Sequence, residues 1–204
     1  SPMADAPQGV PISALVFGGR RRSLAPLVFQ ARNWRHGVLV GAAMASETTA
    51  AATGDVGVVR RDPMAMKPFA GYNFGDYWRH WLSMADRVPR LPQVFQVNWF
   101  RRDDSGRFLW PGYGENLRVL AWIIDRCHGG ATADETAIGA VPRRDAINLA
   151  GLNLPDATVS ELLSVDAMQW RKEAEDIGAY LEGFGSRLPD DLRSELGDLR
   201  ARLK

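Results

Sequence analysis

The stretch Phe100–Asn116, with the sequence FRRDDSGRFLWPGYGEN, indicates how the chain folds around its most informative residues. The segment Val94–Phe100 is β-branched and aromatic and partly alternates with polar side chains, which predicts a strand. Asp103–Gly106 has the composition of a turn, and Arg107–Trp110 is predicted to return as a second strand. We therefore expect a β-hairpin, followed by a glycine-rich loop and the start of a helix.

Three aromatic rings and one carboxamide would meet at this hairpin, namely Phe100, Phe108, Tyr113 and Asn116. From the local pattern alone, aromatic side chains in a hairpin belong more often to a core than to a binding site. The loop favours a binding site, because Gly112 and Gly114 allow a backbone to approach a ligand closely. The carboxamide offers both a donor and an acceptor and can read the edge of a purine. We expect a slot for a flat ligand, in which stacking holds any base and the amide selects one.

Length and composition limit the possible classes of protein. With 204 residues, of which 46% are hydrophobic, the chain can bury the core of one domain or large subdomain. Its net charge of +1 produces no overall field, so neither nucleic acid nor a membrane is expected as a partner. The single cysteine, Cys127, excludes an internal disulfide and favours a cytoplasmic location. Because the chain starts with Ser1, we expect it to be a piece of a longer protein.

Hydrophobic patterns predict strands mainly in the first half of the chain and helices towards its C-terminal end, which gives a mixed α/β fold. The predicted strands before the hairpin are Ile12–Phe17, Leu27–Phe29 and Val38–Val40. The predicted helices are Asp76–Ala85, Glu115–Cys127, a segment from Ser164 or Asp166 to about Gly183, and a last segment with Leu192, Leu196, Leu199 and Leu203. Thr158–Glu161 has the form of a capping box. The expected inward residues of the second helix include Leu117, Leu120, Ile123 and Ile124.

Two further segments have alternative interpretations. Gly18–Arg22 follows a predicted strand, where a turn can expose backbone N–H groups and an arginine can grip a phosphate. The alternative is a solvated charge run, which we favour for at least two of its three arginines. Ser46–Gly57 consists of small residues without aromatics and predicts a mobile surface loop, with a short helix as the alternative.

Several kinds of site have no support in the sequence. None of the three lysines lies in a Gly-Lys-Ser/Thr sequence, so the chain has no Walker A loop of its own. His36, His80 and His128 lack the spacing of metal ligands and are expected to be core or surface residues. Cys127 and His128 are adjacent and diverge on a helix, so a catalytic dyad is a minor alternative. We expect no metal site in this chain.

Taken together, these segments resemble GTP-dependent phosphoenolpyruvate carboxykinase, specifically its C-terminal portion. The matching blocks are GVPISALVFGGRR, HGVLVGAAMASE, DPMAMKPFAGYNFGDYWRHWLSM and VNWFRRDDSGRFLWPGYGEN, and the resemblance covers essentially the whole chain. It implies the C-terminal nucleotide-binding part of that fold, with a C-terminal helical segment at about 158–204. It also implies a gluconeogenic lyase that converts oxaloacetate and GTP to phosphoenolpyruvate, GDP and carbon dioxide with Mn²⁺ or Mg²⁺.

The resemblance assigns nucleotide-contacting roles to individual residues. Phe100, Phe108 and Tyr113 would enclose the guanine base, and Asn116 would read its edge. Gly114 and Glu115 would contribute backbone contacts, and Arg20 would contact the phosphates. Tyr113 stands where many members of the family have phenylalanine, and its ring can still stack.

The resemblance also assigns a lid to the segment at about 46–58. This lid includes Ser46, Glu47, Thr48, Thr49 and Gly54. Its small residues suit a segment that must order and disorder cheaply. Thr53–Asp55 differs in charge from the basic counterpart in animal enzymes.

The family's P-loop and its catalytic and metal-binding residues are expected upstream of Ser1. Phosphoryl transfer needs metal ions and a phosphate cradle, so the chain alone is expected to be inactive. Its isolated form is expected to self-associate through bared strand edges and apolar faces. The alternative function is a non-catalytic nucleotide-binding or interaction module that shares the carboxykinase tail.

Overall fold

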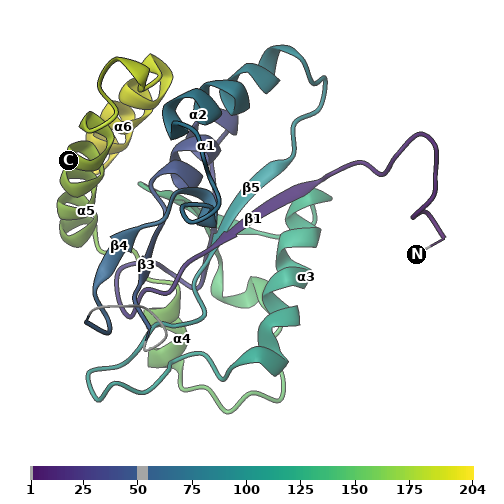
Figure 1. The fold of residues 1–204 in the computed structure, drawn as a ribbon. Coiled ribbons are helices and arrows are strands. Elements are labelled where there is room, and N and C mark those ends of the chain that lie inside the picture. Colours follow the sequence, from purple (N-terminus) through teal and green to yellow (C-terminus); the bar gives the residue numbers. More distant parts are fainter. Residues whose placement is uncertain (1, 50–54) are drawn as a thin grey trace.

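The computed structural model describes residues 2–49 and 55–204 and has the mixed α/β class that the sequence predicts. A five-stranded sheet with the order β1-β5-β2-β7-β6 forms its centre (Figure 1). Its strands are β1 Ala14–Gly18, β2 Val28–Gln30, β5 Gln93–Val97, β6 Ala133–Thr136 and β7 Gly139–Pro142. The pairing of β1 with β5 is parallel, and the other pairings are antiparallel. The remaining strands, β3 Ala45–Glu47 and β4 Val59–Arg61, form a separate antiparallel pair.

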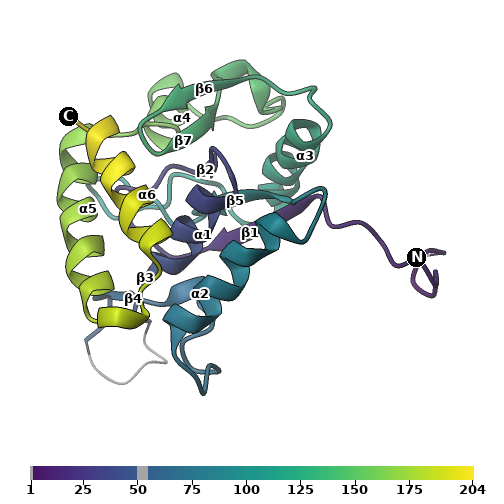
Figure 2. The ribbon, with the colours of Figure 1, turned by 90° about the horizontal axis from the view of Figure 1, so that it is seen from above.

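Helices cover both faces of the central sheet (Figure 2). The α-helices are α1 Trp34–Ala42, α2 Phe74–Ser83, α3 Asn116–Cys127, α4 Asp156–Leu162, α5 Ala167–Glu182 and α6 Asp190–Arg202. Short 3₁₀ turns occupy Pro63–Ala65, Met84–Asp86, Tyr113–Glu115, Arg144–Ala146 and Gly185–Arg187. None of the helices in the described part of the chain is long and apolar enough to cross a membrane.

The sheet separates two apolar clusters. On one face, Phe29 and Val94 pack with α1, α2, α5 and α6. On the other face, Val28 and Phe95 pack with α3 and α4. Successive residues of β2 and β5 therefore enter opposite clusters, as the two-residue period of a strand requires.

The prediction of a strand at Val38–Val40 is wrong, because these residues lie within helix α1. The Asn33 side chain accepts a hydrogen bond from the backbone N–H of His36 and begins the helix. Most of α1 is buried, so its apolar residues form a continuous run that periodicity cannot distinguish from a buried strand. Glycine lets the helix approach the sheet: a Cβ at Gly37 would lie 2.6 Å from Val94 Cγ2.

The second strand of the predicted hairpin is absent from the described chain, where β5 ends at Val97 and only one bridge joins Arg102 to Phe108. The turn itself is as expected. The Asp103 carboxylate accepts hydrogen bonds from the side chain of Ser105 and from the backbone and side chain of Arg107. These bonds, with that of Ser105 the strongest cause, lower the pKa of Asp103 to about 2. The ladder ends after Val97, and the side-chain amide of the next residue, Asn98, forms hydrogen bonds with the backbone of loop residues.

Several helix predictions are confirmed, and the predicted capping box is wrong. The Asp166 side chain caps α5 through the backbone N–H groups of Met168 and Gln169. The leucines predicted for the last helix are all buried. Thr158–Glu161 is not a capping box, because α4 begins two residues earlier, after Pro155. Strands β6 and β7 had no counterpart in the prediction.

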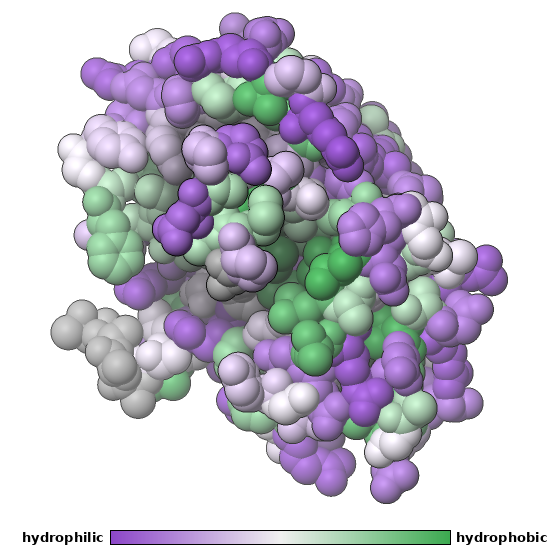
Figure 3. Space-filling view, turned by 90° about the vertical axis from the view of Figure 1, so that its right-hand side faces the viewer, coloured by the Kyte–Doolittle hydropathy of each residue, from purple (hydrophilic) through white to green (hydrophobic). Residues whose placement is uncertain are grey.

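The buried face of α3 also differs from the prediction. Its buried residues are Val119, Trp122 and Ile123, of which only Ile123 was expected. The other three predicted residues are exposed: Leu117 at 70%, Leu120 at 38% and Ile124 at 53%. Figure 3 shows hydrophobic residues gathered in the hollowed middle of the face on this side of the molecule. An amphipathic pattern locates a helix but does not show which apolar side meets the core of this chain.

Candidate functional site

Asn98, directly after β5, joins the two segments that carry the predicted site. Its side chain is fully buried and makes four hydrogen bonds. The Oδ1 atom accepts from the backbone N–H groups of Arg21 and Phe100, each at 3.2 Å. The Nδ2 atom donates to the carbonyls of Arg21 at 2.8 Å and Ala25 at 3.0 Å. The side-chain amide of Asn98 therefore fixes the position of Gly18–Arg22, which we call the arginine loop, relative to the start of the aromatic segment at Phe100.

The structure brings the predicted aromatic pair together. The rings of Phe100 and Phe108 are 6.1 Å apart between centroids and make an angle of 72°. The guanidinium of Arg102 lies over the Phe108 ring at 4.4 Å, and that of Arg20 lies 6.0 Å from the Phe100 centroid. The two rings thus have fixed neighbours, although Phe108 remains 52% exposed.

Tyr113 is placed differently from these two rings. Its side chain is 92% exposed, and it makes no ring contact with another aromatic residue of the described chain. It lies in the 3₁₀ turn that follows Gly112, whose φ of 123° is strained for any residue with a side chain. A Cβ at Gly114 would meet no heavy atom within 4 Å. The predicted slot is therefore open at this end, and space remains beside the backbone of the glycine-rich loop.

Asn116 begins α3 and accepts a hydrogen bond at Oδ1 from the indole Nε1 of Trp110, at 2.9 Å. The neighbouring Glu115 side chain is occupied by an ion pair with Arg118 at 2.6 Å. A contact from Glu115 to a ligand would therefore use its backbone.

Arg20 connects the aromatic pair to the base of the predicted lid. Its backbone N–H donates to Ser46 Oγ at 3.1 Å, and its guanidinium donates twice to the carbonyl of Glu47 at 3.3 Å. Ser46 and Glu47 lie in strand β3, so the predicted mobile loop begins later than expected. The pairing of β3 with β4 holds both ends of this segment at the candidate site.

Thr48 adds hydrogen bonds between the two ends of the predicted lid segment. Its backbone N–H donates to the carbonyl of Val58 at 2.9 Å, and its hydroxyl oxygen accepts from the Val58 N–H at 3.0 Å. The Thr48 hydroxyl also donates to the carbonyl of Asp55. Thr49 follows as a half-buried residue, whereas Gly54 and Thr53 lie outside the described residues.

The interpretation of the arginines as a mostly solvated charge run is wrong for Arg21. Its guanidinium binds both oxygens of Glu173, at 3.1 and 3.0 Å, and each side chain is only 12% exposed. Arg61 of β4 binds the same carboxylate at 2.9 Å. Burial raises the pKa of Glu173, but the hydrogen bonds and charges of Arg21 and Arg61 outweigh it and lower the pKa overall. Arg22 is more exposed, yet it binds the Glu47 carboxylate through its backbone and its side chain.

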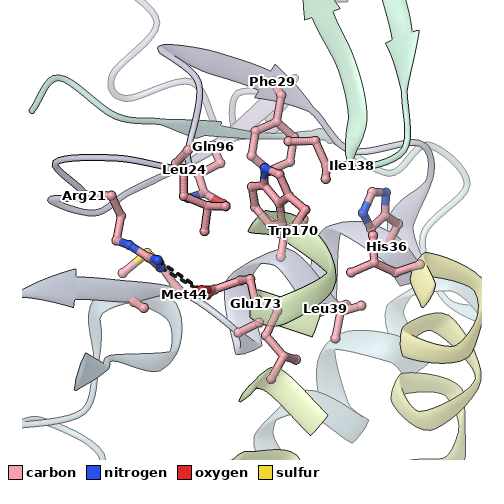
Figure 4. A pocket seen from close by; sticks show the side chains of 16 residues that line it. Arg21, Leu24, Phe29, His36, Leu39, Met44, Gln96, Ile138, Trp170 and Glu173 are labelled. Carbon is pink, nitrogen blue, oxygen red and sulfur yellow. Dashed lines mark hydrogen bonds and ion pairs between the residues drawn. The ribbon is translucent and has the colours of Figure 1, made fainter. Parts of the chain in front are cut away.

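A small cavity of about 40 Å³ lies behind this ion pair, between the sheet and α1, α5 and α6 (Figure 4). Phe29, Trp170 and Leu39 belong to its mostly apolar wall, and the Arg21–Glu173 pair closes one side. This volume has room for about one or two water molecules, far less than a nucleotide needs. The cavity is thus a gap in the packing that is too small for a nucleotide.

The described residues offer little support for acid–base or metal chemistry. No group of three or more His, Cys, Asp or Glu residues among them could hold a metal ion. His36 is a core residue, and its Nδ1 accepts from the backbone N–H of Arg32 at 3.1 Å. Burial raises the pKa of the Cys127 thiol, which disfavours the reactive thiolate.

A family model described as "Phosphoenolpyruvate carboxykinase C-terminal P-loop domain" matches residues 1–202. The chain belongs to this family. Proteins named "Phosphoenolpyruvate carboxykinase (GTP)" are 54% identical to it in Treponema pallidum (98% of the chain), 54% in Neocallimastix frontalis (97%) and 50% in Renibacterium salmoninarum (100%). The carboxykinase chain spans about a third of the length of these curated relatives, 33%, 33% and 34% respectively.

Sequence reasoning on this carboxykinase domain missed the residues that hold the site together. Asn98, Trp110 and Glu173 were not singled out, although they fix the arginine loop and the amide of Asn116. A polar residue at the end of an apolar strand was the available signal for Asn98. The partner of Glu173 lies 152 residues away in sequence, so no local pattern could reveal it.

Proposed function

We propose that this chain is part of a cytoplasmic, GTP-dependent phosphoenolpyruvate carboxykinase. The intact enzyme converts oxaloacetate and GTP to phosphoenolpyruvate, GDP and carbon dioxide. In this proposal the chain supplies guanine recognition, a phosphate-contacting arginine and the lid over the active site. The relatives' names support the reaction, and the arrangement of Phe100, Arg20 and the β3–β4 pair supports the division of roles.

One observation carries the assignment of roles: Arg20 contacts both the Phe100 ring and the carbonyl of Glu47. Parallel strands β1 and β5 bring their carboxyl ends to the same edge of the sheet, and ligands of α/β proteins bind at such edges. Arg20 follows β1 and Phe100 follows β5. A nucleotide stacked on the rings would therefore have a guanidinium and the lid base beside it.

Selectivity for guanine is assigned to hydrogen bonds. Stacking between two rings contributes about 0.5–1.5 kcal/mol beyond the burial of area and holds any base. A polar group left unpaired by a wrong base costs about 1–3 kcal/mol, so an amide distinguishes bases more strongly than a ring does. In this proposal, Asn116 and the backbone of Gly114 and Glu115 take this role.

The divalent metal does not fit the residues described in this chain, which contain no ligand cluster. Arg20 can contribute a fixed positive charge beside the phosphates, and the lid can exclude water when it closes.

The test uses the intact protein and measures phosphoenolpyruvate formation from oxaloacetate with GTP and with ATP. Without GTP-dependent formation in the wild type, the proposed function is wrong. We expect Asn116→Ala to lower the preference for GTP over ATP by about tenfold, since it removes the amide that pairs with the base. Phe108→Leu is the comparison, because it weakens stacking for both nucleotides and should leave the preference nearly unchanged. An equal loss with both nucleotides in Asn116→Ala would contradict the role of the amide.

A further inference from the structure

Trp110 determines which atom of the Asn116 amide faces away from the core. Its indole ring is 2% exposed, and its Nε1 lies 2.9 Å from Asn116 Oδ1. An indole N–H can only donate a hydrogen bond, so its partner must be the amide oxygen and not the nitrogen. The orientation of this amide therefore follows from the chemistry of a buried neighbour.

The donor of this hydrogen bond is held rigidly. Trp110 packs in the same cluster as Leu27, Val119 and Leu162, which come from three other parts of the chain. The backbone N–H of the preceding residue, Leu109, donates a hydrogen bond to the backbone carbonyl of Arg101 at 2.9 Å. Because the indole cannot rotate away without opening this cluster, the amide oxygen of Asn116 stays occupied.

The amide then presents its NH₂ group on the side away from the indole. In the described part of the chain, Nδ2 of Asn116 has no hydrogen-bond partner, although the residue is half-buried. Position 6 of guanine and hypoxanthine carries an oxygen acceptor, whereas position 6 of adenine carries an amino donor. An NH₂ group can pair with the first and is repelled by the second.

We propose that Trp110 is a positioning residue for specificity: it holds Asn116 with the NH₂ group towards the base and so selects 6-oxopurine nucleotides. This inference rests on the proposed function, because it places the base against Asn116. It adds that the contact reads position 6 and is indifferent to the 2-amino group. Guanine and hypoxanthine nucleotides should therefore be equivalent at this contact.

The experiment measures the dissociation constants of GDP, IDP and ADP for the intact protein by calorimetry, alongside its carboxykinase activity. Trp110→Phe removes the N–H and keeps an aromatic ring in the cluster. We expect the ratio of ADP to GDP dissociation constants to fall about tenfold, while the ratio for IDP to GDP stays within about twofold. An unchanged ADP-to-GDP ratio, or a uniform weakening of all three nucleotides, would overturn the inference.

Trp99→Phe is the matched control. Trp99 lies 6.5 Å from Trp110 between ring centroids, and its indole N–H has no hydrogen bond with the described residues. The same loss of an N–H should therefore leave both ratios unchanged. A fall in the ADP-to-GDP ratio equal to that of Trp110→Phe would show that the effect comes from repacking and would refute the inference.

A second variant keeps the inference testable if Trp110→Phe does not fold. In Asn116→Asp, one carboxylate oxygen can still accept from Trp110, and the other would present an acceptor to the base. The preference should then reverse in favour of ADP, and a retained preference for GDP would refute the inference. Nucleotide binding without turnover would refute the proposed function alone, whereas no binding by the wild type would refute both.

Discussion

Asn98 is the residue on which the geometry of the candidate site depends most directly. Its four hydrogen bonds join backbone groups of the arginine loop to the N–H of Phe100. The sequence predicted a continuous strand through this position. The prediction failed because the buried side-chain amide of Asn98 forms hydrogen bonds with the backbone of loops before and after β5. Strand propensity depends on a residue and its neighbours in sequence, whereas the hydrogen-bond partners of Asn98 are up to 77 residues away.

Replacing Asn98 by leucine would leave two backbone N–H groups and two carbonyls without their partner. We expect this variant of the intact protein to lose more than about 3 kcal/mol of unfolding free energy, because each unpaired buried group costs about 1–3 kcal/mol. Chemical denaturation measures the loss. Asn148→Ala is the control, since Asn148 is exposed and its side chain accepts only one hydrogen bond from the described residues, from the backbone N–H of Ala150 at 3.0 Å. Equal stability of the two variants would contradict this account.

His36 should make stability depend on pH. Burial, followed by the positive charges of Arg202 and Arg32, lowers its pKa from 6.5 to about 3. The unfolded chain takes up a proton as pH falls below 6.5, whereas the folded protein does so only near 3. The contribution of His36 to stability is therefore intact above pH 6.5 and decreases by about 1.4 kcal/mol per pH unit down to about 3.

Urea unfolding of the intact protein at about pH 7.5 and about pH 5 tests this dependence. His36→Gln should reduce the difference in unfolding free energy between the two conditions by about 2 kcal/mol, because glutamine does not titrate. His80→Gln changes an exposed histidine of α2 and should retain the wild-type difference. If both variants lose stability on acidification as the wild type does, His36 is not the cause.

At the scale of elements, sequence patterns located α2, α3, α5 and α6 within a few residues, because each has apolar residues at helical spacing. They failed for α1, whose burial removes the alternation between apolar and polar faces. They also failed for β6 and β7, which are only four residues long each. The aromatic pair of Phe100 and Phe108 and the turn between them were predictable, since they are close together in sequence.

The packing of α1 on the sheet gives a prediction at this scale. A Cβ at Gly37 would lie 2.6 Å from Val94 Cγ2 and 2.7 Å from Val94 Cβ, so α1 would have to move away from β5. We expect Gly37→Ala to lower the unfolding free energy of the intact protein by about 1–3 kcal/mol through overpacking.

Gly197→Ala in α6 is the matched control for this substitution. A Cβ at Gly197 would meet no heavy atom within 4 Å, so alanine should stabilise the helix by up to about 1 kcal/mol. Thermal and chemical denaturation should show changes in unfolding free energy of opposite sign for the two variants. A stabilising Gly37→Ala would contradict the close approach of α1 to the sheet.

At the scale of the whole molecule, one side carries apolar residues without a partner in the described chain. Leu117 and Ile124 of α3 are 70% and 53% exposed, and Val16 of the edge strand β1 is 42% exposed. An exposed strand edge beside an apolar surface favours association. This asymmetry of the surface could be predicted only in general terms, since it depends on which face of α3 enters the core.

We expect the 204-residue chain to self-associate with increasing concentration, as measured by light scattering. A double substitution, Leu117→Lys with Ile124→Lys, should reduce association because it places charges on the apolar surface. Met168→Lys changes a residue of α5 that is 64% exposed on the other side of the sheet, and it should have no effect. A monodisperse monomer at all concentrations would contradict the prediction.

The parallel register of β1 and β5 sets a fixed spacing at the sheet edge. Gly18 pairs with Val97, so Arg20 and Phe100 stand two and three residues beyond one shared pair. A single inserted or deleted residue in either strand would displace one of them by about 3.3 Å, more than a hydrogen bond tolerates, and would turn the following side chains to the opposite face. Natural variation in this domain should therefore tolerate exchanges of side chain along β1 and β5 far better than changes in their length.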